Sequence, residues 1–167
     1  MIKKTIILSR VAFFISTGII LSEIRLFRLP SGGSITPCSM FFLFLPGYLY
    51  GPQIGILSAI IAGLIGFIIN PIFLNPIQFF LDYILAFGLL GSSKIFLKNK
   101  TIIINYLLAS ALKLLCSVIS GILFFNSYGP KVLLSYLYSL AYNSSYHIPE
   151  IILTVMLYNL GLKKFLK

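Results

Sequence analysis

Long apolar stretches separated by short polar turns are the feature that most restricts the folds open to this chain. They lie near residues 5–24, 36–50, 53–70, 76–97, 101–126 and 143–162. A helix needs roughly 20 mostly apolar residues to cross a bilayer. Because 59% of the 167 residues are hydrophobic and only 10% are charged, little polar surface remains for a soluble domain. We predict one all-α membrane domain over 1–167, a bundle of six transmembrane helices.

The first apolar stretch is predicted to remain as a helix and not to be cleaved as a signal peptide. It carries Arg10 and has no small-residue cleavage site before Glu23. Cys38 and Cys116 show no metal-ligand spacing, and we expect both to be buried thiols.

The positive charges predict the orientation of the bundle. With six spans, three clusters of basic residues fall on one side, and the positive-inside rule makes that side cytoplasmic. These clusters are Lys3, Lys4 and Arg10; Lys94, Lys98 and Lys100; and Lys163, Lys164 and Lys167. Both termini are therefore expected in the cytoplasm, with the loops near 25–35, 70–76 and 127–142 outside. Charges at helix ends also argue against a nucleic-acid partner, despite a net charge of +10.

Two ionisable side chains lie inside predicted spans. Asp82 falls in the outward half of the fourth span, and Lys113 falls in the middle of the fifth. A charge at such a depth is costly unless it faces a partner or a cavity. Asp82 and Lys113 therefore either pair and lock two helices together, or line a polar pocket.

The fifth span also has a polar stripe. Lys113, Ser117, Gly121 and Phe125 are spaced four apart and share one helix face. Ser117 and Gly121 alone would fit a groove for a neighbouring helix. A lysine at one end and an aromatic ring at the other favour a binding face.

A segment rich in tyrosine opens the sixth span. Residues 136–147 hold four tyrosines, three serines, an asparagine and the chain's one histidine. An aromatic belt at the membrane interface would explain the tyrosines, but not Asn143. Glu150, His147 and Tyr146 are further candidate site residues. Aromatic rings, a carboxylate and amide or hydroxyl groups together suit a flat organic cation.

No motif in the chain supplies energy or catalysis. It has no phosphate-binding loop and no His/Cys metal set, and nothing supports a hydrolase nucleophile. We predict that the chain is not an enzyme, and that active transport would need a partner or an ion gradient.

Four spaced stretches resemble one known family. They are 29–36, 76–87, 119–125 and 138–150, and they include Gly32-Gly33, Gln78, Asp82-Tyr83, Ser120-Gly121 and Tyr138-Ser139. The chain resembles the thiamine-specific substrate-binding subunits (ThiT type) of energy-coupling-factor transporters. The resemblance implies a multi-pass protein of a bacterial cell membrane with an outward-facing thiamine site. It also implies assembly with a membrane coupling subunit and two ATPase subunits that hydrolyse ATP.

The resemblance also implies roles for individual residues. Asp82 stands where the family commonly has a glutamate that holds the ligand, and Ser117 and Phe125 stand where a known member has histidine and tryptophan. The expected ligand contacts are Asp82, Tyr83, Lys113, Ser117, Gly121, Phe125, Tyr138, Ser139 and Asn143.

We therefore predict a vitamin-capture subunit that binds thiamine between the fourth, fifth and sixth helices, with no cofactor and no metal, and with lipid around it. The loop 31–36 is expected to close over the site. Two other hypotheses stay open. One is a proton-coupled transporter of a small organic cation that works alone, and the other is a membrane scaffold in which Asp82 and Lys113 are structural.

Overall fold

The computed structural model describes residues 2–30, 32–95, 100–126 and 132–165, and most of them are helical. Apolar segments favour helices in a bilayer because a helix satisfies its own backbone groups. The elements in chain order are α1 (Ile2–Glu23), β1 (Phe27–Arg28), β2 (Ser34–Ile35), α2 (Ser39–Tyr50), α3 (Pro52–Ile69), α4 (Pro76–Phe79), α5 (Ala86–Gly91), α6 (Ile102–Asn126), α7 (Val132–Leu157) and α8 (Lys163–Phe165).

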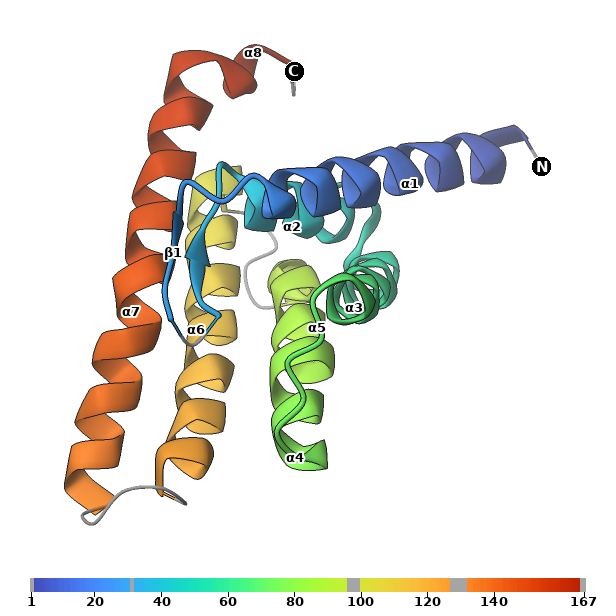
Figure 1. Cartoon of the computed structure of the whole chain (residues 1–167). Helices are drawn as coiled ribbons and strands as arrows, with labels where there is room; N and C mark the ends of the chain where they lie inside the picture. Colours follow the sequence, from blue (N-terminus) through green and yellow to red (C-terminus); the bar gives the residue numbers. More distant parts are fainter. Residues whose placement is uncertain (1, 31, 96–99, 127–131, 166–167) are drawn as a thin grey trace.

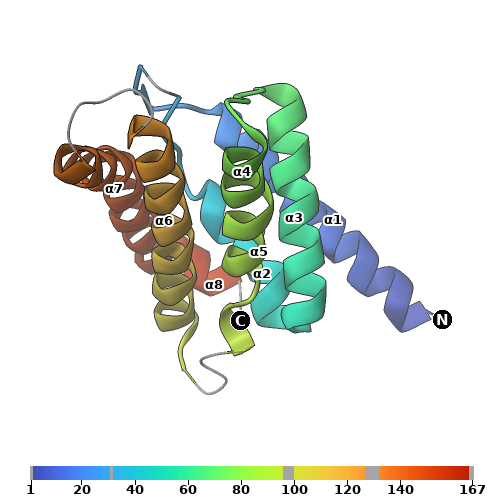
Figure 2. The same cartoon turned by 90° about the horizontal axis from the view of Figure 1, so that it is seen from below.

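The two longest helices form one wall of the molecule. Helices α6 and α7 lie side by side, α4 and α5 stand next to α6, and α1 crosses near one end of the bundle (Figure 1). From below, α3 packs against the other side of α5, and α1 runs outward with its N-terminus away from the bundle (Figure 2). The space between α5, α6, α7 and the β1–β2 hairpin is where the site described below lies.

The outer surface is apolar, as hydrocarbon requires. Leu8, Ile68 and Leu160 are each 70% exposed or more. Within the described residues, three helices are long and apolar enough to cross a membrane by length and composition: Lys4–Glu23 in α1, Pro52–Ile69 in α3 and Ile102–Leu123 in α6. Ser39–Tyr50 and Pro76–Gly91 are apolar but shorter. A helix lies at each of the six predicted spans, but the number of crossings and the cytoplasmic placement of the termini stay predictions.

The last long helix begins earlier than the sequence suggested. We expected a span over 143–162 after an outward loop at 127–142, whereas α7 already begins at Val132. The tyrosines and serines that lower the hydropathy of 132–142 are accommodated because one face of α7 packs on α6. Ser139 on that face is fully buried and its hydroxyl donates to the Val118 carbonyl at 2.8 Å. Polarity here marks a contact between helices and not a loop.

Between α4 and α5 the chain stays helical but changes its winding. Asn75 caps the start, since its side chain accepts a hydrogen bond from the Gln78 amide at 2.8 Å, and Pro76 occupies the first turn. Residues Phe80–Leu85 then form a π-helical stretch that contains Asp82. Such wide turns inside helices often occur at functional sites.

Three glycines bring α2, α3 and α5 into backbone contact. A methyl group added at Gly47 or at Gly55 would overlap the Gly91 carbonyl, and one at Gly91 would overlap the Gly55 carbonyl. Small residues of this kind let membrane helices approach closely. Beside this contact, Phe41 and Tyr106 pack edge to face at 5.2 Å between ring centroids, and both are fully buried.

The short β1–β2 hairpin folds back over the bundle. Phe27 pairs with Ile35 and Arg28 with Ser34. The Leu29 amide donates to the Gly33 carbonyl at 2.7 Å, and Gly32 adopts φ +97°, a conformation that glycine takes without a steric penalty. The turn therefore brings Gly33 and Ser34 against the interior of the bundle.

Candidate functional site

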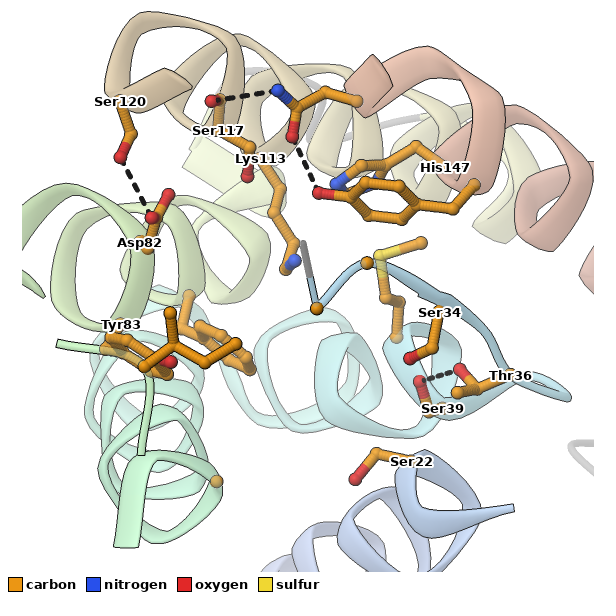
Figure 3. Close-up of a pocket in the computed structure, with 18 of the residues that line it drawn as sticks. Ser22, Ser34, Thr36, Ser39, Asp82, Tyr83, Lys113, Ser117, Ser120 and His147 are labelled. Atoms are coloured by element: carbon orange, nitrogen blue, oxygen red, sulfur yellow. Dashed lines mark hydrogen bonds between the residues drawn. The ribbon is translucent and has the colours of Figure 1, made fainter. Parts of the chain in front are cut away.

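A single cavity of about 310 Å³ collects most of the polar side chains that the bundle buries. It lies between the π-helical stretch Phe80–Leu85 (hereafter the Asp82 segment), α6, α7, the hairpin and the start of α2 (Figure 3). Its size falls at the low end of small-molecule sites, roughly 300–1,000 Å³. Of the predicted site residues, the cavity is lined by Asp82, Tyr83, Lys113, Ser117, Gly121, Asn143, Tyr146, His147 and Glu150.

Asp82 faces the cavity and is held by two neighbours. Its Oδ2 accepts hydrogen bonds from Gln78 Nε2 and from Ser120 Oγ, both at 2.8 Å. Figure 3 shows the Ser120 bond reaching across from α6. Both bonds go to Oδ2, so Oδ1 is oriented by them and available to a ligand group. Neutral donors fix the carboxylate here without cancelling its formal charge.

Lys113 does not form an ion pair with either buried acid. Among the described residues the ion pair present is Arg25 with Glu23, at 3.0 Å. The Lys113 ammonium lies over the Phe87 ring, 4.9 Å from its centroid, a cation–π contact. It is near enough to Asp82 and Glu150 to interact electrostatically with both. One predicted alternative was that Asp82 and Lys113 form a direct ion pair that locks two helices together. The structure shows no such ion pair between these two described residues.

Asn143 links α7 to α6 at the wall of the cavity. Its Nδ2 donates to the Ser117 carbonyl at 3.2 Å and to the Ser139 carbonyl at 2.9 Å, and its Oδ1 accepts from the Tyr146 hydroxyl at 2.6 Å. A methyl group at Gly121 would overlap the Ser139 hydroxyl and lie 3.1 Å from Asn143 Nδ2. Asn143 and Gly121 thus line the cavity while also setting the distance between the two helices.

A second carboxylate lies on another wall. Glu150 is 4% exposed, and its Oε1 accepts from Ser39 Oγ at 2.9 Å and from the Met40 amide at 3.4 Å. Ser39 in turn shares a 2.7 Å hydrogen bond with Thr36. These contacts tie α7 to the start of α2, where Cys38 takes a left-handed conformation with φ 62°.

The hairpin covers the cavity and is tied to α7 by one tyrosine. The Gly33 amide donates to the Tyr142 hydroxyl at 3.0 Å, and a methyl group at Gly33 would lie 2.6 Å from the Tyr146 ring. Glycine is therefore needed for the hairpin to approach α7 this closely. The cover includes Gly32, Gly33, Ser34 and Thr36, which agrees with the loop 31–36 that the sequence suggested, although residue 31 lies outside the described residues.

Removing the Tyr142 hydroxyl should loosen this cover. Tyr142→Phe leaves the Gly33 amide without its acceptor, which costs about 0.5–1.5 kcal/mol. If the hairpin closes over a bound ligand, we expect a dissociation rate about 2- to 10-fold faster, measured by stopped-flow ligand release. Tyr136→Phe, at a tyrosine that is 48% exposed, is the matched control and should leave the rate unchanged. An unchanged rate in Tyr142→Phe would show that this hydrogen bond does not hold the cover closed.

Two predicted ligand contacts lie outside the cavity, and a third has a side chain that the structure does not describe. Tyr138 is 50% exposed and stacks on Tyr142, with ring centroids 6.2 Å apart. Ser139 is buried between α6 and α7, where its hydroxyl is used by the Val118 carbonyl. The side chain of Phe125 lies outside the described residues. Tyr142, one turn further along α7 and not among the predicted residues, lines the cavity together with the predicted Tyr146.

Several cavity residues were missed by the sequence analysis. Gln78 and Ser120 both bind Asp82, and Ser39 binds Glu150. Gln78 precedes Asp82 by four residues, so the shared helix face could have identified it. Ser39 could not be found in this way, because its partner is 111 residues away.

A half-open cavity lined by buried polar and charged side chains, inside an apolar helical bundle, defines a membrane protein with room for one small molecule. Comparison of the sequence with known families then shows to which family this membrane protein belongs. The model of the family described as "Thiamine transporter protein" matches residues 8–167, and the chain belongs to this family. The predicted family is thereby confirmed. Because its members are transporters, the predictions of a membrane protein and of a non-enzyme are confirmed as well.

Two relatives extend the comparison. The chain is 30% identical to the thiamine transporter ThiT of Bacillus subtilis (strain 168) over 168 residues, which cover 90% of this chain and 87% of that protein. Its fold is similar to the solved structure of ThiT from Listeria monocytogenes, with a TM-score of 0.78 over 97% of this chain and 96% of that one. At 23% identity the second likeness concerns the fold.

Proposed function

We propose that this chain captures thiamine in the cavity between the Asp82 segment, α6 and α7, as the substrate-binding subunit of an importer in a bacterial cell membrane. The observation that carries the proposal is the charge of the cavity. Two carboxylates, Asp82 and Glu150, and one ammonium, Lys113, line it, which leaves a formal charge of −1. Thiamine carries one fixed positive charge on its thiazolium ring, so the cavity and the ligand are complementary.

The cavity offers matching partners for the rest of the molecule. Tyr83 and Tyr146 present rings that suit a flat cation, and Ser117 offers a hydroxyl for the heteroatoms of the ligand. Asp82 Oδ1 is the proposed counter-charge. Lys113 is near enough to both carboxylates to offset part of their mutual repulsion. Asn143 and Gly121 would act mainly by positioning α6 against α7.

A titration of the purified protein tests the proposal. By isothermal calorimetry, thiamine should bind with a stoichiometry of one, and an analogue with a neutral ring in place of the thiazolium should bind at least about tenfold more weakly, since one charge interaction of about 1.4 kcal/mol or more is lost. Equal binding of both compounds, or no binding of thiamine, would contradict it.

The energy source is a separate part of the proposal. The family resemblance suggests a six-span subunit that works with a coupling subunit and two ATPases, and the distribution of basic residues suggests cytoplasmic termini. Thiamine uptake in cells should then require those partners. Uptake without them that is abolished by an uncoupler would instead support the stand-alone proton-coupled transporter. If the protein binds thiamine but cells take up none, with or without the partner subunits, the protein captures thiamine but the proposed transport is wrong.

A further inference from the structure

One buried polar side chain in the cavity has no partner in the described structure. His147 is 1% exposed, and neither Nδ1 nor Nε2 makes a hydrogen bond. A buried imidazole left in this way costs free energy, and native proteins rarely leave both ring nitrogens unsatisfied. Its ring packs against Tyr146 at 4.7 Å between centroids, which fixes its orientation but supplies no partner.

The surroundings of His147 indicate what is missing. It lines the same cavity as Glu150 and Ser39, and Figure 3 places it on the side away from Asp82, beside Lys113. Lys113 is near enough to interact with it electrostatically, but its ammonium lies over the Phe87 ring and makes no hydrogen bond to the imidazole. Glu150 is held by Ser39 and the Met40 amide. Glu150 thus has protein donors at Oε1, whereas neither ring nitrogen of His147 has a partner.

Resting on the proposed function, we propose that His147 and Glu150 form a second polar subsite, which binds a neutral hydrogen-bonding group of the ligand while Asp82 faces its positive charge. A neutral imidazole offers one donor and one acceptor, and a carboxylate adds an acceptor. The matching chemistry is a group that both donates and accepts. Thiamine carries two such groups, the aminopyrimidine and the terminal hydroxyl.

The proposal predicts opposite effects of one substitution on binding and on stability. His147→Phe removes the unsatisfied nitrogens and keeps a ring, so the ligand-free protein should melt about 2–4 °C higher. Thiamine should bind about 10- to 100-fold more weakly, because a buried ligand group loses its partner. His147→Gln can still donate and accept hydrogen bonds and should retain most of the affinity for thiamine. If His147→Phe does not fold, the affinity of His147→Gln still tests the proposal.

Controls separate this subsite from the proposed function. Tyr106→Phe removes a hydroxyl from a fully buried ring on α6 that does not line the cavity, and it should leave thiamine affinity unchanged. Failure of the wild-type protein to bind thiamine would overturn the proposed function itself. If the wild-type protein and His147→Phe bind thiamine with the same affinity, only the subsite proposal is overturned. The imidazole would then serve in packing or bind a water molecule.

Two thiamine analogues identify the bound group. In one a carbonyl oxygen replaces the pyrimidine amino group, and in the other hydrogen replaces the terminal hydroxyl. The group bound by His147 is the one whose removal weakens binding to the wild-type protein and has little further effect on His147→Phe. If each analogue loses as much affinity for His147→Phe as it loses for the wild-type protein, the imidazole contacts neither group and the proposal is wrong.

Discussion

Asp82→Asn should weaken thiamine binding by about 30- to 1000-fold, the largest effect we expect from any single change in the cavity. The substitution keeps the size of the side chain. Its remaining oxygen can still accept the hydrogen bonds that Gln78 and Ser120 donate to Oδ2 in the wild-type protein. It removes the formal negative charge that faces the ligand. A buried charge interaction of this kind is worth about 2–4 kcal/mol, which corresponds to the stated change in Kd. Calorimetric titration measures it directly.

Asp82→Glu is the matched control for this change. It restores the charge with the longer side chain that the family commonly has at this position, so affinity should stay within about tenfold of the wild-type protein. A weak Asp82→Glu variant beside an unaffected Asp82→Asn variant would show that shape and not charge governs the site. In that case Asp82 would serve to hold Ser120 and α6 in place.

Gly55→Val should prevent stable folding. Any side chain at Gly55 meets Gly47 and the Gly91 carbonyl, which are backbone groups on two neighbouring helices and cannot move independently. Overpacking of a well-packed interior typically costs about 1–3 kcal/mol, and here three helices must separate at once, so we expect a loss at or above the top of that range. That is a large share of a typical stability of about 5–15 kcal/mol.

Gly66→Ala, in the same helix, is the control for Gly55→Val. A methyl group at Gly66 meets nothing within 4 Å, and alanine favours a helix over glycine by about 1 kcal/mol. Thermal unfolding in detergent, followed by size-exclusion chromatography, should show little change or a small gain for Gly66→Ala and aggregation or a greatly lowered Tm for Gly55→Val. Equal melting of the two variants would show that the contact of α2, α3 and α5 is not needed.

The sequence predicted the site best where chemistry and spacing agreed along one helix. Asp82 and Lys113 were identifiable because a charge inside an apolar stretch is unusual, and Ser117 and Gly121 because they repeat every four residues. Nine of the twelve candidate residues do line the cavity. Whether Asp82 and Lys113 pair directly was not predictable, because pairing depends on how the helices rotate against one another, and in the structure Lys113 lies over the Phe87 ring instead.

The errors came from reading polarity as exposure. Residues 127–142 were expected to be an outward loop, yet α7 begins at Val132 and Ser139 is buried in it, where its hydroxyl donates to the Val118 carbonyl of α6. Partners far apart in sequence, such as Ser39 with Glu150, are set by tertiary packing that no local pattern encodes. The π-helical turn that holds Asp82 was also absent from the periodicity of the sequence.

A structure of the protein crystallised with thiamine tests the account most directly. We predict continuous ligand density in the 310 Å³ cavity, with the thiazolium ring beside the Asp82 carboxylate and Lys113 still separate from that acid. Thiamine bound elsewhere, or Lys113 closing onto Asp82 while the cavity stays empty, would contradict the claim that this buried charge is kept for a cationic ligand.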